Sequence, residues 1–395
     1  MKTNRSDNVR NLTFLFIATF FIFVDFYNSQ TITPLYLLDV GGTEFHSGLQ
    51  STMFFLTAVI LRFYFGPMAD IKGNKTTLII GTIAFTTAPL LFLFSENIWF
   101  IIAVRMYQSI GLAAYFSSAS SLTSALAPKL RLGTYIGLYR FVIMAALLVG
   151  PATALKIIDL QGYKIYNVLG IILGLVALIF IFLIKEPERK ENLEKKNGAA
   201  SAYKMLKLVK DKELSPIYLS IFTLSIVYGF VLTFVAIYIQ KETSVNPGIF
   251  FTFFGLGSVV ANLVTGQISD KFGRAVVAFP CVFLLGAGTA TFYFLPVFIP
   301  VLYIGSIIAG FGYAGSIAAM ISWIVDIAPV NVRTTALAVQ DSSIDLGIAF
   351  GSFIFGLLVY VIGLPYSFAF SGILLILFAC WKIFNISRVV SVGSK

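Results

Sequence analysis

Charged residues, histidine and cysteine are scarce in this 395-residue chain, and their scarcity excludes several classes of protein. Asp, Glu, Lys and Arg make up 12% of the sequence, about half of the roughly 25% that soluble domains contain. The two cysteines and the single histidine lack the spacing of a metal site, so we expect no metal and no cofactor. The sequence has neither a phosphate-binding loop nor a nucleophile-elbow motif, which argues against an ATP-driven protein and against an enzyme.

Long apolar runs occupy most of the chain. Hydrophobic residues make up 58% of it, and a helix needs about 20 apolar residues to cross the hydrocarbon of a membrane. We therefore expect an all-α membrane protein with twelve transmembrane helices. The runs and their polar breaks place these helices at 11–37, 47–67, 76–94, 98–125, 133–155, 164–184, 215–239, 247–268, 275–294, 298–325, 334–360 and 365–384.

The longest polar segment divides the chain into two halves. Residues 185–214 are rich in Lys, Arg, Asp and Glu, and six predicted helices lie on each side of them. The sequence therefore predicts an N-terminal six-helix bundle over 1–184, a cytoplasmic linker over 185–214 and a C-terminal six-helix bundle over 215–395.

Positive charge is distributed unevenly between the two sides of this predicted topology. Most of the 28 Lys and Arg residues fall in the terminal segments and inner loops, whereas Lys156, Lys164 and Lys241 fall in outer loops. This is the positive-inside pattern with both termini in the cytoplasm. The pattern also accounts for the net charge of +10, so we expect no nucleic-acid partner. We expect a multi-pass protein of the plasma membrane that is in contact with the lipid bilayer.

A short polar motif occurs twice, 200 residues apart. Residues 66–73 read Gly-Pro-Met-Ala-Asp-Ile-Lys-Gly, and residues 266–273 read Gly-Gln-Ile-Ser-Asp-Lys-Phe-Gly. Each copy follows the second apolar run of its half, where we expect a turn. An internal repeat of this kind indicates duplication of a six-helix half, as in secondary transporters.

The repeated motif resembles the signature of the major facilitator superfamily, Gly-x-x-x-Asp-(Arg/Lys)-x-Gly-(Arg/Lys)-(Arg/Lys). The second copy fits better, because Ile71 and Asn74 replace basic residues in the first. Arg105–Gly111 is similar to a motif of proton-coupled members, and Gly150-Pro151 to the core of the antiporter motif. The resemblance covers essentially the whole chain. It implies two pseudo-symmetric six-helix bundles and points to the bacterial drug/proton antiporter branch.

The resemblance also implies that the two motif copies are cytoplasmic latches that break when the transporter opens inward. Asp70 and Asp270 are expected in loops, each near the start of a helix of the opposite half, whose N–H groups and dipole favour a carboxylate. A merely topogenic loop is the alternative. The predicted gating residues are Gly66, Asp70, Gly73, Lys75, Gly266, Asp270, Gly273 and Arg274.

Ionisable side chains inside apolar helices are costly and usually mark function. The helical rise places Asp25 and Arg105 at nearly the same depth in the membrane. We hypothesise that Asp25 takes up and releases the coupling proton and that Arg105 tunes it, because burial disfavours the charged carboxylate and a nearby cation favours it. The alternative is a static ion pair that only ties the two helices together.

A second group of charges lies in the fifth and eleventh predicted helices. Arg140 and Asp341 occupy equivalent positions of the repeat, and Asp345 lies one helical turn from Asp341 on the same face. These residues either line the inner half of a cavity, where they attract cationic cargo or relay protons, or form a structural charge pair between the halves. The candidate proton-coupling residues are Asp25, Arg105, Asp341 and Asp345.

These patterns together predict a secondary transporter with a cargo site near the membrane midplane. We expect a monomer that exports small amphipathic or cationic compounds in exchange for protons, by alternating access. A proton symporter that imports a sugar or an organic anion is the alternative, as is an exporter of a metal-chelating metabolite. The candidate substrate-binding residues are Asp25, Asn28, Arg62, Tyr107, Tyr139, Arg140, Gln340 and Asp341.

Overall fold

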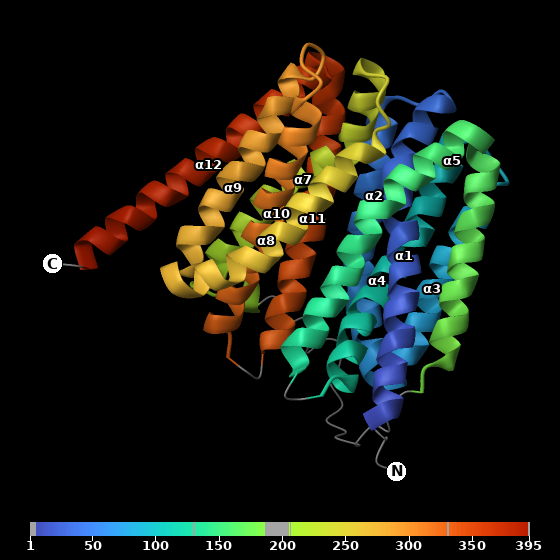
Figure 1. Ribbon diagram of the computed structural model, residues 1–395, viewed down its shortest axis with the longest axis horizontal. Coiled ribbons are helices and arrows are strands. Elements are labelled where there is room, and N and C mark those ends of the chain that lie inside the picture. Colours follow the sequence, from blue (N-terminus) through green and yellow to red (C-terminus); the bar gives the residue numbers. More distant parts are fainter. Residues whose placement is uncertain (1–4, 129–130, 186–204, 206, 330–331, 394–395) are drawn as a thin grey trace. The chain divides into compact units, whose positions relative to one another are not determined.

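The computed structural model describes residues 5–128, 131–185, 205, 207–329 and 332–393. The regular structure of these residues is entirely helical (Figure 1), which confirms the predicted all-α class. The helices are α1 (Arg5–Asp39), α2 (Glu44–Lys72), α3 (Asn74–Phe92), α4 (Ile98–Leu126), α5 (Leu132–Leu183), α7 (Ser215–Glu242), α8 (Gly248–Phe272), α9 (Arg274–Thr291), the 3-10 helix η2 (Phe292–Phe294), α10 (Val301–Ile327), α11 (Arg333–Ile362) and α12 (Leu364–Gly393).

Within the described part of the chain, 11 helices are long and apolar enough to cross a membrane. One of them, α5, has 52 residues. One crossing needs about 20 residues, so α5 is more than twice as long as a single crossing requires. Its backbone breaks at Gly162, where φ is 78° and ψ is 175°. The two halves of α5 are therefore separate crossings, and the total agrees with the twelve predicted. Glycine adopts such a positive φ without the strain that a side chain would cause.

Glycines with positive φ recur with the internal repeat. Gly73 and Gly273 have φ of 94° and 97°, and Gly162 and Gly363 have φ of 78° and 80°. The members of these pairs stand 200 and 201 positions apart, and each pair separates equivalent helices in the two halves. The backbone turns thus follow the duplication that the sequence indicates.

The two motif copies are helical rather than turns. Residues 66–72 form the last turns of α2, and residues 266–272 form those of α8. The prediction that Asp70 and Asp270 lie in loops is therefore wrong. The polar residues continue the helical hydrogen bonding, and the following glycine still donates its N–H to the carbonyl four residues earlier at 3.1 Å. The helix ends only at that glycine, because glycine can adopt the left-handed backbone.

The chain divides into two compact units. The first comprises Met1–Val40 and Met53–Tyr203, and the second comprises Gly41–Thr52 and Lys204–Lys395. The first turns of α2 thus belong to the second unit, while the rest of α2 belongs to the first. The predicted linker, 185–214, lies largely outside the described residues.

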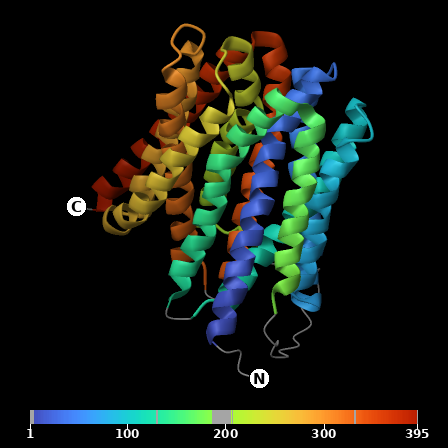
Figure 2. The same cartoon turned by 45° about the vertical axis from the view of Figure 1, so that its right-hand side comes forward.

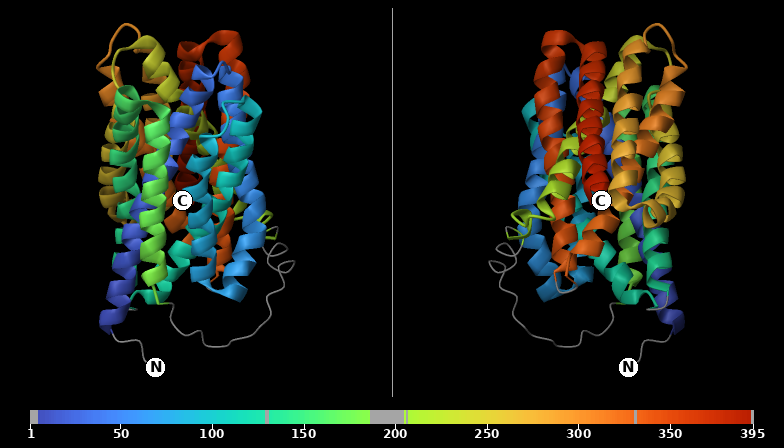
Figure 3. Two further views of the ribbon diagram at one scale, coloured as in Figure 1. Left: turned by 90° about the vertical axis from the view of Figure 1, so that its right-hand side faces the viewer. Right: turned by 90° about the vertical axis from the view of Figure 1, so that its left-hand side faces the viewer.

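Each unit is built from long helices packed in pairs. In the first unit α1 packs along α5, and α3 packs against both α4 and α5; Figure 2 shows α1 beside the second half of α5. In the second unit α10 packs against α8 and α9, α7 against α11, and α9 against α12 (Figure 3). Large aromatic side chains fill the interior of the second unit, among them the fully buried Phe230, Phe250, Phe292 and Phe368.

Candidate functional site

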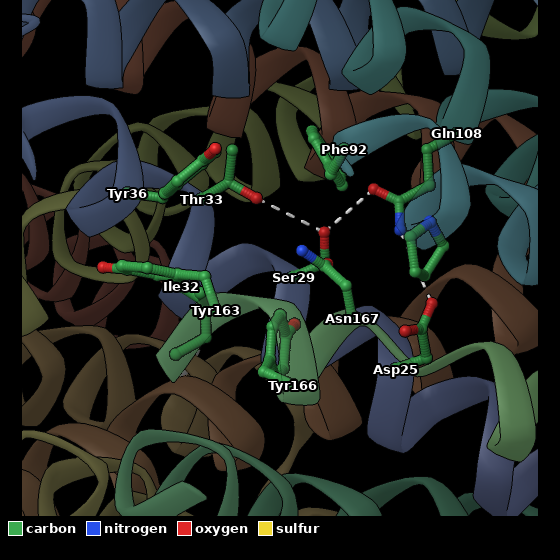
Figure 4. A pocket seen from close by; sticks show the side chains of 11 residues that line it. Asp25, Ser29, Ile32, Thr33, Tyr36, Phe92, Gln108, Tyr163, Tyr166 and Asn167 are labelled. Carbon is green, nitrogen blue, oxygen red and sulfur yellow. Dashed lines mark hydrogen bonds between the residues drawn. The ribbon is translucent and has the colours of Figure 1, made fainter. Parts of the chain in front are cut away.

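One face of α1 is polar where this helix passes through the first unit. Asp25, Ser29 and Thr33 follow one another at intervals of four residues, which places them on the same side of the helix. Each of the three is buried, with 4% of its surface exposed. This face lies against α3, α4 and the second half of α5 (Figure 4), so its polar groups must find partners inside the bundle.

Arg105 reaches this polar face from α4 and is fully buried. Its Nη1 donates to Ser29 Oγ at 2.7 Å and also to the side-chain oxygen of Gln108. The guanidinium carbon lies 4.2 Å from the centroid of the Phe54 ring, so the cation also contacts an aromatic face. These contacts offset part of the large cost of taking a cation out of water.

Gln108 connects Arg105 to Asp25. Its Oε1 accepts hydrogen bonds from Arg105 and from Ser29 Oγ, which is 2.9 Å away. Its Nε2 donates to Asp25 Oδ2 over 3.5 Å, a long hydrogen bond (Figure 4). The structure thus brings the two predicted proton-coupling residues of the first unit into one network, in which an amide lies between the cation and the carboxylate.

A small cavity lies beside Asp25, lined by residues of α1, α3, α4 and the second half of α5 (Figure 4). Its volume is about 20 Å³, which suits about one water molecule. Ligand pockets usually have at least about 300 Å³, so this cavity is far too small for cargo. Asp25 was also predicted to bind substrate, and in this conformation its surroundings have room for water alone.

On the other side of Asp25 the helices pack tightly. A Cβ atom added at Gly170 would lie 3.3 Å from Asp25 Oδ1 and 3.1 Å from Pro89 Cγ. One turn further along α5, a Cβ at Gly174 would lie 2.4 Å from Thr86 Oγ1. Because α3 and α5 approach this closely only through glycine, the space between them is filled on this side.

Asn28 lies one turn from Asp25 and packs against the antiporter-like segment of α5. A Cβ at Gly150 would lie 2.7 Å from the Asn28 side chain. With its amide nitrogen turned toward the carbonyls, Asn28 donates to Val24 O at 3.1 Å and to Gly150 O at 2.9 Å. This predicted substrate-binding residue therefore joins α1 to α5 just before Pro151.

The other predicted substrate residues of the first unit lie apart from Asp25. The hydroxyl of Tyr107 forms a hydrogen bond of 2.7 Å with Thr87 Oγ1 on α3. Tyr139 is buried in α5, its neighbour Arg140 is exposed, and Arg62 on α2 is partly buried. None of these four predicted residues is among those that line the cavity beside Asp25.

The predicted residues of the second unit lie together on α11. Gln340 and Asp345 are buried, and Asp341 is partly buried. Gln340 Nε2 donates to Asp341 Oδ1 over 3.4 Å. Arg140 belongs to the first unit, so its predicted relation to Asp341 stays a prediction.

The basic residues of the two motif copies have different partners inside their own units. Lys75 Nζ donates to two carbonyl oxygens at the C-terminal end of α5, at 2.9 and 2.6 Å. Arg274 instead forms ion pairs with two carboxylates. Its Nη1 contacts Asp270 on α8, and its Nε lies 2.8 Å from Asp326 Oδ2 on α10. The side chain of Asp70 lies outside the described residues.

Several residues of the site were missed by the sequence prediction. The four-residue spacing after Asp25 could have identified Ser29 and Thr33. Gln108 lies within the motif that contains Arg105, and its polar amide inside an apolar helix could have identified it. Tyr166 and Asn167 line the cavity from α5, but nothing in the sequence distinguishes them from other polar residues near a helix end.

Comparison with known proteins places the chain in a family. The sequence model of the Major Facilitator Superfamily matches residues 15–248 and 217–391, which together cover most of the chain. An uncharacterized MFS-type transporter of Methanocaldococcus jannaschii is 23% identical over 96% of this chain and 99% of its own length. A multi-drug resistance efflux pump PmrA homolog of Lactococcus lactis is 24% identical over 68% of this chain and 69% of its own.

Two further relatives agree with this placement. The staphylopine export protein of Staphylococcus aureus is 24% identical over 91% of this chain and 93% of its own. Among solved structures, the nucleoside transporter NupG superposes with a TM-score of 0.80 over 94% of this chain and 99% of its own, at 13% identity. A likeness at this identity shows the fold alone. The chain belongs to the Major Facilitator Superfamily, and it is a multi-pass membrane transporter rather than an enzyme.

Proposed function

We propose that the protein exports small amphipathic or cationic compounds in exchange for protons, and that Asp25 takes up the coupling proton. The observation that carries this proposal is the buried network in which Gln108 lies between the Asp25 carboxylate and the Arg105 guanidinium. Burying a carboxyl group in an apolar bundle costs free energy, and such groups usually serve a function. Proton uptake and release is such a purpose in a transporter.

The network provides a means of coupling protonation to conformation. With Asp25 ionised, the opposite charges of α1 and α4 attract each other through Gln108. Protonation of Asp25 removes the negative charge, and the balance of forces on the two helices changes. An alternating-access transporter needs only that protonation favour one of its conformations over the other.

The relatives support export as the direction of transport. The names of two of them describe a multi-drug resistance efflux pump and an export protein. The small volume of the cavity beside Asp25 supports a proton or water there rather than cargo. Cargo is then bound elsewhere, and the predicted residues Arg62, Tyr139, Arg140, Gln340 and Asp341 remain the proposed candidates.

Transport by the purified protein in liposomes tests this function. The transported compound is ethidium, a fluorescent lipophilic cation. When a pH gradient drives protons across the membrane in one direction, ethidium should move in the opposite direction. Asp25→Asn should abolish the dependence on the gradient. Glu242→Gln, which neutralises an exposed carboxylate at the end of α7, should retain it. Normal gradient dependence in Asp25→Asn would refute the role of Asp25, and ethidium moving together with the protons would indicate symport.

Export of a metal-chelating metabolite is a second candidate, favoured by the staphylopine export protein, whose likeness extends over 91% of this chain. Staphylopine should then compete with ethidium in the same liposomes and raise the thermal stability of the purified protein, because a ligand of the folded state stabilises it. Competition by tetraphenylphosphonium without competition by staphylopine would favour lipophilic cations instead.

The predicted pair of Arg140 and Asp341 needs a test of its own. Arg140→Asp and Asp341→Arg should each lower transport. If the two residues form a structural pair, the double exchange restores transport; if they bind cargo or protons separately, the double exchange stays inactive.

A further inference from the structure

The polar face of α1 continues beyond Asp25 to the end of the helix. After Asp25, Ser29 and Thr33 it includes Tyr36 and, at the end of α1, Asp39. The 14 residues from Asp25 to Asp39 correspond to roughly 21 Å of helix. The predicted topology places this end of α1 at the outer side of the membrane.

Residues of this polar face line the cavity beside Asp25. Its walls include Ser29 and Thr33 of α1 and, nearer the outer end, Tyr36 and Tyr163 (Figure 4). Ser29 Oγ lies 3.4 Å from Thr33 Oγ1 and 2.9 Å from Gln108 Oε1, and Gln108 donates to Asp25. Oxygen and nitrogen atoms therefore follow one another from Thr33, two turns beyond Asp25, to the carboxylate.

Two tyrosines close the outer end of the cavity. The ring centroids of Tyr36 and Tyr163 are 4.6 Å apart, with an angle of 49° between the ring planes. The Tyr163 hydroxyl donates to Asp39, which is exposed. One hydrogen bond thus links a residue of the cavity wall to an exposed carboxylate.

The outer end of this polar face is acidic. The exposed Glu96 follows α3, and the exposed Asp159 lies on α5 three residues before Gly162. The exposed Lys164 is a neighbouring positive charge in the sequence. Besides Asp25, the charged and titratable groups around the cavity from all the helices packed there are Tyr36, Asp39, Glu96, Arg105, Asp159, Tyr163 and Tyr166.

The opposite end of the cavity is closed by packing. Gly170 and Gly174 hold α5 tightly against α3 below Asp25, as described above. Further down, Thr19 on α1 forms a hydrogen bond of 3.1 Å with the buried Tyr115 on α4. In this conformation the polar atoms around Asp25 continue toward the outer end of α1, whereas the opposite side is filled by side chains and backbone.

We infer that protons reach Asp25 from the outer side by a path inside the first unit, along the polar face of α1, with Tyr36 and Tyr163 as its gate and Asp39 at its mouth. The inference rests on the proposed proton coupling at Asp25. It adds that protons and cargo use separate routes, because the cavity that leads to Asp25 has a volume of about 20 Å³, which suits a water molecule and excludes an organic cation.

Thr33→Leu tests the path, because the larger apolar side chain fills the space of about one water molecule and removes a hydroxyl. Proton-driven ethidium transport in liposomes should fall by about tenfold, whereas ethidium counterflow at equal pH on both sides should stay within about twofold of wild type, because exchange of cargo for cargo needs no proton uptake. Thr13→Leu makes the same change at an exposed position of the same helix and should alter neither rate.

A second pair of variants tests the mouth. Asp39→Asn removes both a negative charge and the acceptor of the Tyr163 hydrogen bond, so half-maximal transport should require a more acidic outer solution. Asp211→Asn, at an exposed residue of the second unit, should leave this outer pH unchanged. Tyr163→Phe keeps the ring contact and loses the hydrogen bond, and it should reproduce the direction of the Asp39→Asn shift.

The outcomes separate this path from the proposed function. If Asp25→Asn abolishes gradient dependence while Thr33→Leu and Asp39→Asn behave as wild type, the path is wrong and the role of Asp25 stands. If Asp25→Asn itself retains gradient dependence, the proposed function fails first. If Thr33→Leu loses counterflow as well, Thr33→Val, which removes the hydroxyl at nearly constant volume, decides: normal proton-driven transport in that variant overturns the path.

Discussion

The two units derive from one repeated helical pattern, but they use their interiors differently. With the repeat offsets of 200 and 201 residues, Asp25 and Arg105 of the first unit correspond to Ser225 and Ser306 of the second, both fully buried. Where the first unit has a charged network, the second packs tightly around Ser225: a Cβ at Gly347 of α11 would lie 2.5 Å from Ser225 Cβ. At these two positions the first unit thus carries opposite charges, whereas the second has small uncharged side chains.

The largest expected effect comes from removing the cation of the first unit. Arg105→Ala leaves Gln108 and Asp25 buried without it, and the loss of a buried charge partner costs about 3–5 kcal/mol. Ser306→Ala, at the equivalent position, should cost about 1 kcal/mol because it removes one hydroxyl hydrogen bond. Thermal unfolding of the purified variants and gradient-driven ethidium transport measure the difference. Similar losses in both variants would show that the two interiors are energetically alike.

Exchanging a glycine between the units is expected to have the next largest effect. Gly170 corresponds to Ser371, which is fully buried in α12. Gly170→Ser places a side chain 3.3 Å or less from Asp25 and Pro89, so it should destabilise the first unit by about 1–3 kcal/mol. It should also slow proton-driven transport. Ser371→Gly should cost roughly 1 kcal/mol through backbone entropy and a lost hydrogen bond, with transport unchanged.

The two motif copies should differ by a smaller amount. Arg274 joins two carboxylates that are largely exposed, so Arg274→Ala should cost about 1 kcal/mol after solvent screening. Lys75→Ala removes a cation from the C-terminal end of α5 and should cost about 0.5 kcal/mol.

Asp270→Asn should lower transport more than Asp70→Asn, since the second motif copy is the better formed. Equal or smaller losses in Asp270→Asn would contradict this order, and cysteine accessibility on the cytoplasmic side would show whether either change affects inward opening.

The smallest effect on transport is expected at Tyr107, whose counterpart in the second unit is Ile308. Tyr107→Ile loses the hydrogen bond to Thr87 and should cost about 1 kcal/mol of stability. Its effect on ethidium affinity should be negligible, because Tyr107 packs between α3 and α4 rather than in the cavity. A weaker affinity for ethidium would restore Tyr107 as a cargo residue.

The sequence determines the fold more fully than the site. Apolar runs, basic loops and the repeat predict twelve crossings, and even Gly162 leaves a polar break that separates two runs. Asp25 and Arg105 could be paired in advance because depth follows from helical rise. Their connection through Gln108 could not, since it depends on how α1 and α4 are rotated about their axes.

The predictions for the motif copies, Tyr107 and α5 were limited because helix continuation, side-chain direction and the packing of distant segments are not encoded in local composition. The polar composition of the motif copies suggested loops, yet helical hydrogen bonding continues through them to Gly73 and Gly273. Tyr107 was predicted to line a cavity because it is an aromatic residue inside a helix, two residues after Arg105. Two residues further along a helix, however, a side chain points to a nearly opposite side. The contributions of α5 to the site required the packing of two distant segments, which no local pattern encodes.

The one-residue turn at Gly162 has a consequence for the biosynthesis of the protein. Only Gly162 departs from helical backbone between the two crossings, so no extended loop separates them. We therefore expect the two halves of α5 to enter the bilayer together as a helical hairpin. A chain lengthened at Gly162 by a flexible glycine-serine insert would separate these events, and pulse labelling of its membrane insertion would show the second half entering later than the first.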